Sequence, residues 1–475
     1  MMQLRSLLLV ALFLIGPALS ASAQGKRPGG GGGGGDDGGG GTIACPTDRL
    51  SFSPATSAAF QTALDCANPG ATITLHSDEA AIYEGNFTLR YQTPEYEADG
   101  APKRITIQSD GVADNLLADN RVSPYQQANL AWLKVPSGST APVLTTELKT
   151  LPDGTARAAS HYQFIGIKFY TNQWVSRLVV LGTGTEKTAE ELPRDFVFDR
   201  SFFAGSSGEG TKQGLVANGA NIEIKNSYFK DFKDTANDAQ AIIVWNGAGP
   251  FWIKNNYLEG SGENVMFGGG DPSVSGLIPS DITIAGNYFY KPIGWAWETS
   301  TQSGTALGKK WRIKNLFELK NAYNVTVEGN VFENNWIQAD QRGFAIVFTP
   351  RNQSGGCKWC KVENIIFQNN LIRNSVAGFN LLDRDDTNAS GQLKTVNILN
   401  NLLVNINPIP FEGIITDSSI TAAGRLFQIL STNTRRLYRT PAGPVDLTAA
   451  NNTAFQSREI SFSATLPSND RNNAG

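Results

Sequence analysis

A short pattern of alternating apolar residues recurs along the chain. It reads apolar-x-apolar-x-x-Asn-x-apolar, and its clearest copies begin at Phe251, Ile282, Val325, Ile365 and Val396. In two earlier copies, from Phe196 and Ile222, Ser replaces the Asn. Successive copies begin 26, 29, 31, 43, 40 and 31 residues apart, an interval that suits one coil of a solenoid.

A second set of short apolar runs lies between these copies. The runs are residues 241–245, 265–267, 316–320, 344–348 and 379–382. Helical periodicity is missing, and Asn-Gly or Asp-Gly hairpins do not separate the runs as they would in a β-sandwich. The sequence therefore predicts an all-β, right-handed parallel β-helix over residues 43–455.

The recurrent asparagines have a structural interpretation. Asn256, Asn287, Asn330, Asn370 and Asn401 each follow a predicted strand. Asn tolerates left-handed backbone angles, so each is expected to mark a bend. Stacked coils would place these amides about 4.8 Å apart, within reach of a hydrogen-bonded ladder.

The two ends of the solenoid carry different signals. Residues 57–66 place Phe60 and Leu64 on one side, which predicts a short amphipathic helix that caps the first coil. Residues 456–475 are polar and are expected to form a tail.

The start of the chain has the features of an export signal. Arg5 precedes an apolar run over residues 7–15, and Ala-Ser-Ala at 21–23 fits a cleavage site, so residues 1–23 are expected to be a signal peptide. Residues 24–42 are rich in Gly and predict a flexible linker. No later run is long enough to span a membrane, so the mature chain is expected to be secreted or displayed at the cell surface.

Four cysteines in an exported chain suggest two disulfides. We expect Cys45 to pair with Cys66, and Cys357 with Cys360. The second pair reads Cys-Lys-Trp-Cys, which leaves a redox function open beside that of a loop staple.

Composition narrows the function classes. A hydrophobic fraction of 40% with 17% charged residues indicates a packed core. A net charge of −3 argues against general nucleic-acid binding. The two histidines, at 76 and 161, leave little room for His-based catalysis.

The segment AFQTALDCANPGATITLHSDEAAIYEGNFTL, from Ala59, resembles the opening of the pectin-lyase-like right-handed β-helix superfamily. SGENVMFGG from Ser261, KNLFELKNAYNVTVEGNVFENNW from Lys314 and GFAIVFTPRNQ from Gly343 resemble a group of secreted bacterial β-helix proteins without an assigned activity. The superfamily resemblance implies carbohydrate as the default target, although a fold does not fix a function.

The resemblance also implies candidate chemistry. Hydrolases on this fold use several Asp and a Gly-His-Gly motif, and the chain has no Gly-His-Gly. Lyases on this fold use calcium to neutralise a uronate and Arg or Lys to remove a proton. FELKNAYNVTVEGN is similar to the segment around the basic catalytic residue of alginate-lyase-type β-helices, which implies that position for Lys320. The companion Lys, expected near Phe267, is absent.

Position along the coils supplies the remaining candidates, because residues that end the second strands should stack on one face. Lys320 and Arg351 are candidate bases, and calcium would have oxygen ligands in Asp383, Asp385 and Asp386. Candidate substrate-binding residues are Trp245, Asn246, Trp295, Trp297 and Arg384.

These features predict an exported protein that acts on or binds an acidic extracellular polysaccharide. If it is an enzyme, β-elimination is preferred, since bases and carboxylates are present where a His is not. One alternative is a non-catalytic surface or adhesion protein that binds glycan or protein. Another is a stiff structural spacer.

Overall fold

The computed structural model describes residues 45, 47–77, 82–297, 309–338, 342–407, 424–430, 445–455 and 462–465. Contacts divide the chain into two units, Met1–Ala44 and Cys45–Gly475. The expected signal peptide and the whole of the expected linker fall in the first unit, outside the described residues. The following paragraphs concern the second unit.

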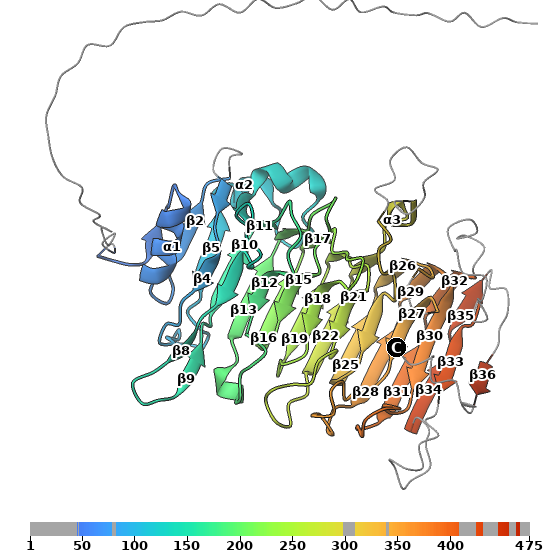
Figure 1. The fold of residues 1–475 in the computed structure, drawn as a ribbon. Coiled ribbons are helices and arrows are strands. Elements are labelled where there is room, and N and C mark those ends of the chain that lie inside the picture. Colours follow the sequence, from blue (N-terminus) through green and yellow to red (C-terminus); the bar gives the residue numbers. More distant parts are fainter. Residues whose placement is uncertain are drawn as a thin grey trace, which may run out of the picture. The chain divides into compact units, whose positions relative to one another are not determined.

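Three long sheets dominate this unit (Figure 1). Sheet A contains, in spatial order, β1 (Ser51–Phe52), β2 (Thr72–Leu75), β5 (Ile105–Ser109), β10 (Tyr162–Ile165), β13 (Arg194–Asp199), β16 (Ala220–Lys225), β19 (Phe251–Lys254), β22 (Ser280–Ala285), β25 (Ala322–Glu328), β28 (Val362–Gln368), β31 (Leu393–Leu399) and β34 (Val445–Ala450).

Sheet B contains β3 (Ile82–Glu84), β6 (Ala131–Lys134), β11 (Ile167–Tyr170), β14 (Phe202–Ala204), β17 (Tyr228–Lys230), β20 (Tyr257–Glu259), β23 (Tyr288–Tyr290), β26 (Val331–Asn335), β29 (Leu371–Ser375), β32 (Leu402–Ile406) and β35 (Thr453–Phe455). Sheet C contains β4 (Phe87–Leu89), β7 (Leu144–Thr146), β12 (Arg177–Leu181), β15 (Gln213–Ala217), β18 (Gln240–Val244), β21 (Glu263–Phe267), β24 (Phe317–Leu319), β27 (Phe344–Phe348), β30 (Ala377–Leu382), β33 (Phe427–Leu430) and β36 (Phe462–Thr465).

The remaining elements are short. The helices are α1 (Ser57–Cys66), α2 (Val112–Asn115), η1 (Pro124–Asn129), η2 (Ala189–Glu191) and α3 (Gly294–Trp297). An antiparallel hairpin joins β8 (Leu148–Thr150) to β9 (Ala156–Ala158). No helix in the described ranges has the length and apolar character needed to cross a membrane.

Each coil contributes one strand to each sheet, and neighbouring strands pair in parallel. The repeat copies lie in register across sheet A, with Phe251 beside Ile282, then Val325, Ile365 and Val396. This arrangement of three parallel sheets is that of a parallel β-helix, as the sequence predicts.

The alternation of apolar residues builds the core. Phe251 and Ile253 of β19 are buried, while Trp252 and Lys254 between and after them are half-buried on the outer side. Rings from successive coils stack inside, as between Phe203 and Phe229, whose centroids lie 4.1 Å apart. Because successive side chains of a strand point to opposite faces, this alternation places one set of residues inside the solenoid and the other set outside.

The asparagine ladder is present, but the bend lies one residue earlier than expected. Asn330 Oδ1 accepts the backbone N–H of Asn287 at 2.9 Å and its Nδ2 at 3.0 Å, and the same contacts repeat along the coils. The left-handed residues are those that precede the ladder, with φ of 52° at Asn255 and 65° at Gly286. The prediction that the ladder residues themselves adopt left-handed angles is therefore wrong, because they use their side chains while the preceding residue turns the backbone.

The predicted second strands correspond to β18, β21, β24, β27 and β30, with boundaries shifted by up to two residues. Helix α1 coincides with the predicted helix, and its Phe60 packs edge-on against Tyr83 and Phe87 at 5.8 and 4.8 Å. Strand β36 lies within the segment expected to be a tail and pairs with β33. Its pairing is made by backbone groups, which the polar composition did not reveal.

Candidate functional site

The outer face of sheet C carries a connected row of polar side chains. Strand pairing places Gln213 beside Gln240 and Gln240 beside Glu263. Arg177 Nε donates to Gln213 Oε1 at 3.2 Å, Gln213 Nε2 donates to Gln240 Oε1 at 3.2 Å, and Gln240 Nε2 donates to Glu263 Oε2 at 2.7 Å. The row thus links four successive coils.

Glu263 also joins a group of ions at the edge of the sheet. Lys314 Nζ lies 3.4 Å from Glu263 Oε1 and 2.7 Å from Asp238 Oδ2. Arg312 Nε lies 3.3 Å from the other oxygen of Asp238. Lys314 reaches this position because the segment before β24 runs along Ser261, whose carbonyl accepts the Lys314 backbone N–H at 3.2 Å.

The next coil adds a second ion pair. Lys320 Nζ lies 3.5 Å from Glu318 Oε1, and Asn315 Nδ2 donates to Glu318 Oε2 at 3.3 Å. Thr349 Oγ1 is 3.5 Å from Glu318 Oε1. Glu318 is fully buried, and the Lys320 side chain is 10% exposed. We call Asp238, Glu263, Lys314, Glu318 and Lys320 the ion cluster.

Burial and neighbouring charges set the two glutamates apart. Burial raises the pKa of Glu263 to about 7. The positive charge of Lys314 lowers this pKa, while the negative charges of Asp238 and Glu318 raise it. Burial also opposes ionisation of Glu318, but Lys320 and Lys314 outweigh it and lower the pKa of that carboxyl. The ion cluster therefore combines a carboxyl that holds a proton near neutral pH with a carboxylate beside an ammonium group.

Such a combination suits an acidic substrate. The ammonium groups of Lys314 and Lys320 can offset the charge of a substrate carboxylate, and a protonated glutamate can donate a hydrogen bond to it. Perturbed pKa values of this kind gather at functional sites, although structural ion pairs also produce them.

Arg351, the second predicted base, does not join the ion cluster. Its backbone N–H donates to Lys320 O at 2.9 Å, so the two residues stack as the coil register implies. Its guanidinium turns instead to Asp386 Oδ1 at 2.5 Å and Asp385 Oδ1 at 3.4 Å.

Two of the three aspartates predicted as calcium ligands, Asp385 and Asp386, lie beside Arg351 and serve local contacts. Asp385 accepts backbone N–H groups of Asn352 at 2.8 Å and Thr387 at 2.8 Å, and Asp383 is fully buried. Over the described ranges, no group of three or more His, Cys, Asp or Glu side chains is placed to hold a metal ion. The residues here do not fit a calcium site, and calcium stays a prediction.

Two of the predicted sugar-binding aromatics, Trp245 and Trp295, pack against neighbouring residues. The Trp245 ring lies 5.3 Å from Arg177 Cζ and against Gly270, where an added Cβ would meet the ring at 3.3 Å. Trp295 is 3% exposed and packs in a cluster with Trp311 and Trp336. The side chain of Trp297 lies outside the described residues.

The polar residues predicted to contact substrate are engaged in loop contacts. Asn246 is buried; its Oδ1 accepts the N–H of Ser273 at 3.0 Å and its Nδ2 donates to Glu186 at 3.0 Å. Arg384 Nη2 donates to Gln392 Oε1 at 3.2 Å.

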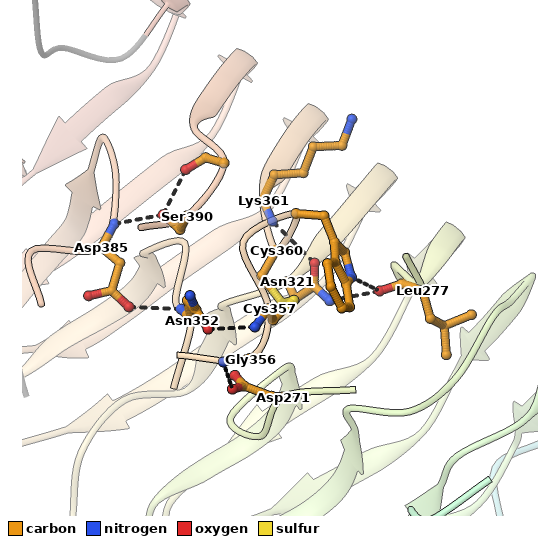
Figure 2. The surroundings of a disulfide bond; sticks show 12 residues. Asp271, Leu277, Asn321, Asn352, Gly356, Cys357, Cys360, Lys361, Asp385 and Ser390 are labelled. Carbon is orange, nitrogen blue, oxygen red and sulfur yellow. Dashed lines mark hydrogen bonds between the residues drawn. A yellow bond between two sulfur atoms is a disulfide. The ribbon is translucent and has the colours of Figure 1, made fainter. Parts of the chain in front are cut away.

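Both expected disulfides are present, joining Cys45 to Cys66 and Cys357 to Cys360. Figure 2 shows the loop of the second pair held on several sides. Cys357 N donates to Asn352 Oδ1 at 2.7 Å, Gly356 N donates to Asp271 Oδ2 at 2.9 Å, and Lys361 N donates to Asn321 Oδ1 at 3.2 Å. With both cysteines fully buried, the pair staples the loop that follows β27.

Sequence reasoning placed Lys320 but missed most of its surroundings. Strands β15, β18 and β21 each begin with a polar residue, namely Gln213, Gln240 and Glu263. A polar residue at the same position of successive repeats is a signal that the sequence contains. Lys314 and Asp238 come from connections of irregular length, for which the repeat gives no register.

No family model matches the sequence, and no curated protein matches it. Among solved structures, the chain is similar to an alginate lyase from Paenibacillus sp., at 14% identity and a TM-score of 0.37 over 86% of this chain and 97% of the other. It is similar to a tailspike protein of an E. coli bacteriophage, in complex with a pentasaccharide, at 10% identity and a TM-score of 0.43 over 86% and 67%. It is also similar to the A-module of a mannuronan C-5 epimerase from Azotobacter vinelandii, at 11% identity and a TM-score of 0.35 over 84% and 82%.

Proposed function

We propose that this protein binds an acidic polysaccharide on the outer face of sheet C and cleaves it by β-elimination. The observation that carries the proposal is the ion cluster. Its buried glutamates pair with Lys314 and Lys320. Taking such charges out of water costs several kcal/mol per ion, so apolar residues at these positions would give a more stable fold. A function that needs these charges explains why they are kept.

The proposed chemistry uses residues of this face. Cations of the face offset the charge of a uronate carboxylate, which makes the C5 proton easier to remove. Lys320 first gives its own proton to water, and its amine then takes the C5 proton. The C5–H electrons form the C4–C5 double bond, and the bond from C4 to the glycosidic oxygen breaks. The proton then passes from Lys320 to the leaving oxygen, which restores the amine.

The test is product formation from defined polymers. We expect purified protein to raise the ultraviolet absorbance of unsaturated product from pectate, alginate or another uronan, and Lys320→Ala to lower the rate by roughly 100-fold or more. Assays with and without calcium test the calcium prediction separately.

The chain offers a matched control for this substitution. Lys225 on the outer face of sheet A pairs with Glu223 at 3.3 Å, with the same spacing of two residues as Glu318 and Lys320. Lys225→Ala should keep the wild-type rate. No product from any uronan, or an unchanged rate in Lys320→Ala, would overturn the lyase proposal.

Two observations favour binding without cleavage as the second candidate. The Lys320 side chain is only 10% exposed, and Arg351 is engaged by Asp385 and Asp386. In this case calorimetry would detect binding of uronan chains that stay intact, and Lys320→Ala would weaken the binding.

The proposal also includes export of the protein and a capping function for helix α1. Export by residues 1–23, with display on the linker over residues 24–42, would bring the protein to extracellular polymers, and two disulfides are compatible with an oxidising compartment. Helix α1, packed on β3 and β4 through Phe60, would close the first coil against solvent.

A further inference from the structure

A polar cavity lies on the outer face of sheet B, on a different sheet from the ion cluster. Its volume is about 380 Å³, within the range of roughly 300 to 1,000 Å³ common for small-ligand pockets. Strands β6, β11, β14 and β17 and the loop over residues 205–209 contribute to its lining. None of its lining residues belongs to the ion cluster.

The cavity exists because one small residue interrupts a column of long ones and a glycine follows it. Pairing places Lys134, Tyr170, Ala204 and Lys230 side by side on four successive coils. Ala204 is the short member between two long neighbours. Next to it, Gly205 is close-packed, since an added Cβ would lie 2.4 Å from Asp231 O. No side chain at these two positions fills the space above them.

One wall of the cavity is aromatic and carries a cation. The ring centroids of Trp132 and Tyr170 lie 5.8 Å apart in an edge-to-face arrangement, with 64° between the ring planes. Lys168 Nζ is 3.2 Å from the Trp132 ring centroid and 4.9 Å from that of Tyr170, and it donates to Gln127 Oε1 at 3.1 Å. Trp132 Nε1 donates to Gln127 O at 3.2 Å, so the wall is fixed before any ligand arrives.

The opposite wall carries ion pairs. Asp231 lies 3.2 Å from Lys230 Nζ and 3.6 Å from Lys233 Nζ. Glu209 lies 2.8 Å from Lys309 Nζ, which also donates to Gly208 O at 2.7 Å.

Among the lining residues the charges balance, with Lys168 and Lys230 against Glu209 and Asp231. Two further ammonium groups lie behind the lining, that of Lys233 3.6 Å from Asp231 and that of Lys309 2.8 Å from Glu209. Glu259, behind Asp231, accepts the Asp231 N–H at 2.9 Å, and burial raises the pKa of Glu259 to about 7. That carboxyl thus carries less than a full charge near neutral pH, and a positive excess remains at the cavity.

We propose that this cavity binds one acidic sugar unit of a polysaccharide, with Trp132 and Tyr170 against its C–H face and Lys168 and Lys230 near its carboxylate. Aromatic rings offer an apolar face to the ring of a sugar, and the surrounding amide, hydroxyl and charged groups can bind its hydroxyls. The site is independent of cleavage on sheet C and would hold a second part of the same polymer or another chain.

Calorimetry tests this proposal with defined probes. The probes are trisaccharides of galacturonate, mannuronate and guluronate, with maltotriose as the neutral counterpart. The Lys320→Ala variant serves as the parent protein, so that cleavage does not consume the probes and binding at sheet C is weakened.

Two substitutions in that parent address the cavity. Ser207 lines the cavity and is exposed, so Ser207→Trp fills its mouth without touching the core, and we expect binding of an acidic trisaccharide to fall at least tenfold. Trp132→Ala should weaken it to a similar degree. The control is Trp252→Ala, since Trp252 is half-buried on sheet A with Lys254 6.0 Å from its ring.

The outcomes separate this proposal from the proposed function. Acidic trisaccharide binding that Ser207→Trp abolishes supports the cavity site, whether or not sheet C cleaves uronans. The proposal is overturned if no acidic trisaccharide binds, if Ser207→Trp leaves binding unchanged, or if maltotriose binds equally well. Equal losses in Trp252→Ala would also overturn it.

Discussion

Glu259 is a buried carboxyl whose protonation should make stability depend on pH. Tyr257 O–H donates to it at 2.8 Å, while burial and then the charge of Asp231 raise its pKa to about 7 from 4.5. Between pH 4.5 and about 7 the folded state keeps a proton that the unfolded chain releases, so stability falls as pH rises.

Glu259→Gln removes this proton exchange. We expect the unfolding free energy of the variant, measured with urea, to rise by about 3 kcal/mol relative to that of the wild type as pH increases through that window. Glu263 contributes the same sign in both proteins and cancels in the difference. Equal pH slopes in the two proteins would show that Glu259 ionises normally.

The ladder asparagines are expected to contribute unequally to the free energy of unfolding. Asn330→Ala removes the acceptor of two buried Asn287 donors, its N–H and its Nδ2, and should lower the free energy of unfolding by roughly 3 kcal/mol. Asn452 ends the described part of the ladder and is half-buried, so water can replace its oxygen, and Asn452→Ala should cost about 1 kcal/mol. Equal losses in chemical denaturation would contradict this gradient.

Side-chain partners were the part of the site that the sequence could not supply. Coil register correctly placed the backbones of Lys320 and Arg351 next to each other, since one donates its N–H to the other's carbonyl. The register says nothing about where a long side chain turns. Lys320 turns toward Glu318 and Arg351 toward Asp386, so the two predicted bases do not meet.

At the scale of elements, strands were easier to predict than bends. Alternating apolar residues fixed β19, β22 and β25 because one face of each must be buried. The bend after each strand was assigned to the ladder Asn, whereas the left-handed residue is the one before it. Either Asn or Gly occupies that earlier position, so a search for one recurring residue type does not detect it.

The two disulfides should differ in their contribution to stability. Cys45–Cys66 closes a separation of 21 residues and pins α1, while Cys357–Cys360 closes one of 3. Chain entropy predicts about 3 kcal/mol for the first and about 2 kcal/mol for the second.

Denaturation of the two double Cys→Ser variants measures this difference. Loss of the first disulfide should lower the unfolding free energy more. A larger loss for the pair over residues 357–360 would mean that native contacts of the loop after β27, and not chain entropy, dominate.

At the scale of the whole molecule, the parallel β-helix was predictable and the site was only partly so. The repeat fixes which residues face outward on each sheet, and hence that a polar row can run along sheet C. The ion cluster also needs Lys314 and Asp238 from irregular connections, and the cavity on sheet B needs Ala204 among longer residues. Such features depend on the three-dimensional arrangement of several coils.

The most direct test of the account is a crystal structure of the Lys320→Arg variant, which keeps the positive charge but lacks the amine base, with an acidic tetrasaccharide of a uronan to which calorimetry shows binding. The account predicts sugar density along the outer face of sheet C, with a carboxylate near Lys314 and the residue 320 position. Density confined to other faces of the protein, with the outer face of sheet C free of sugar, would contradict it.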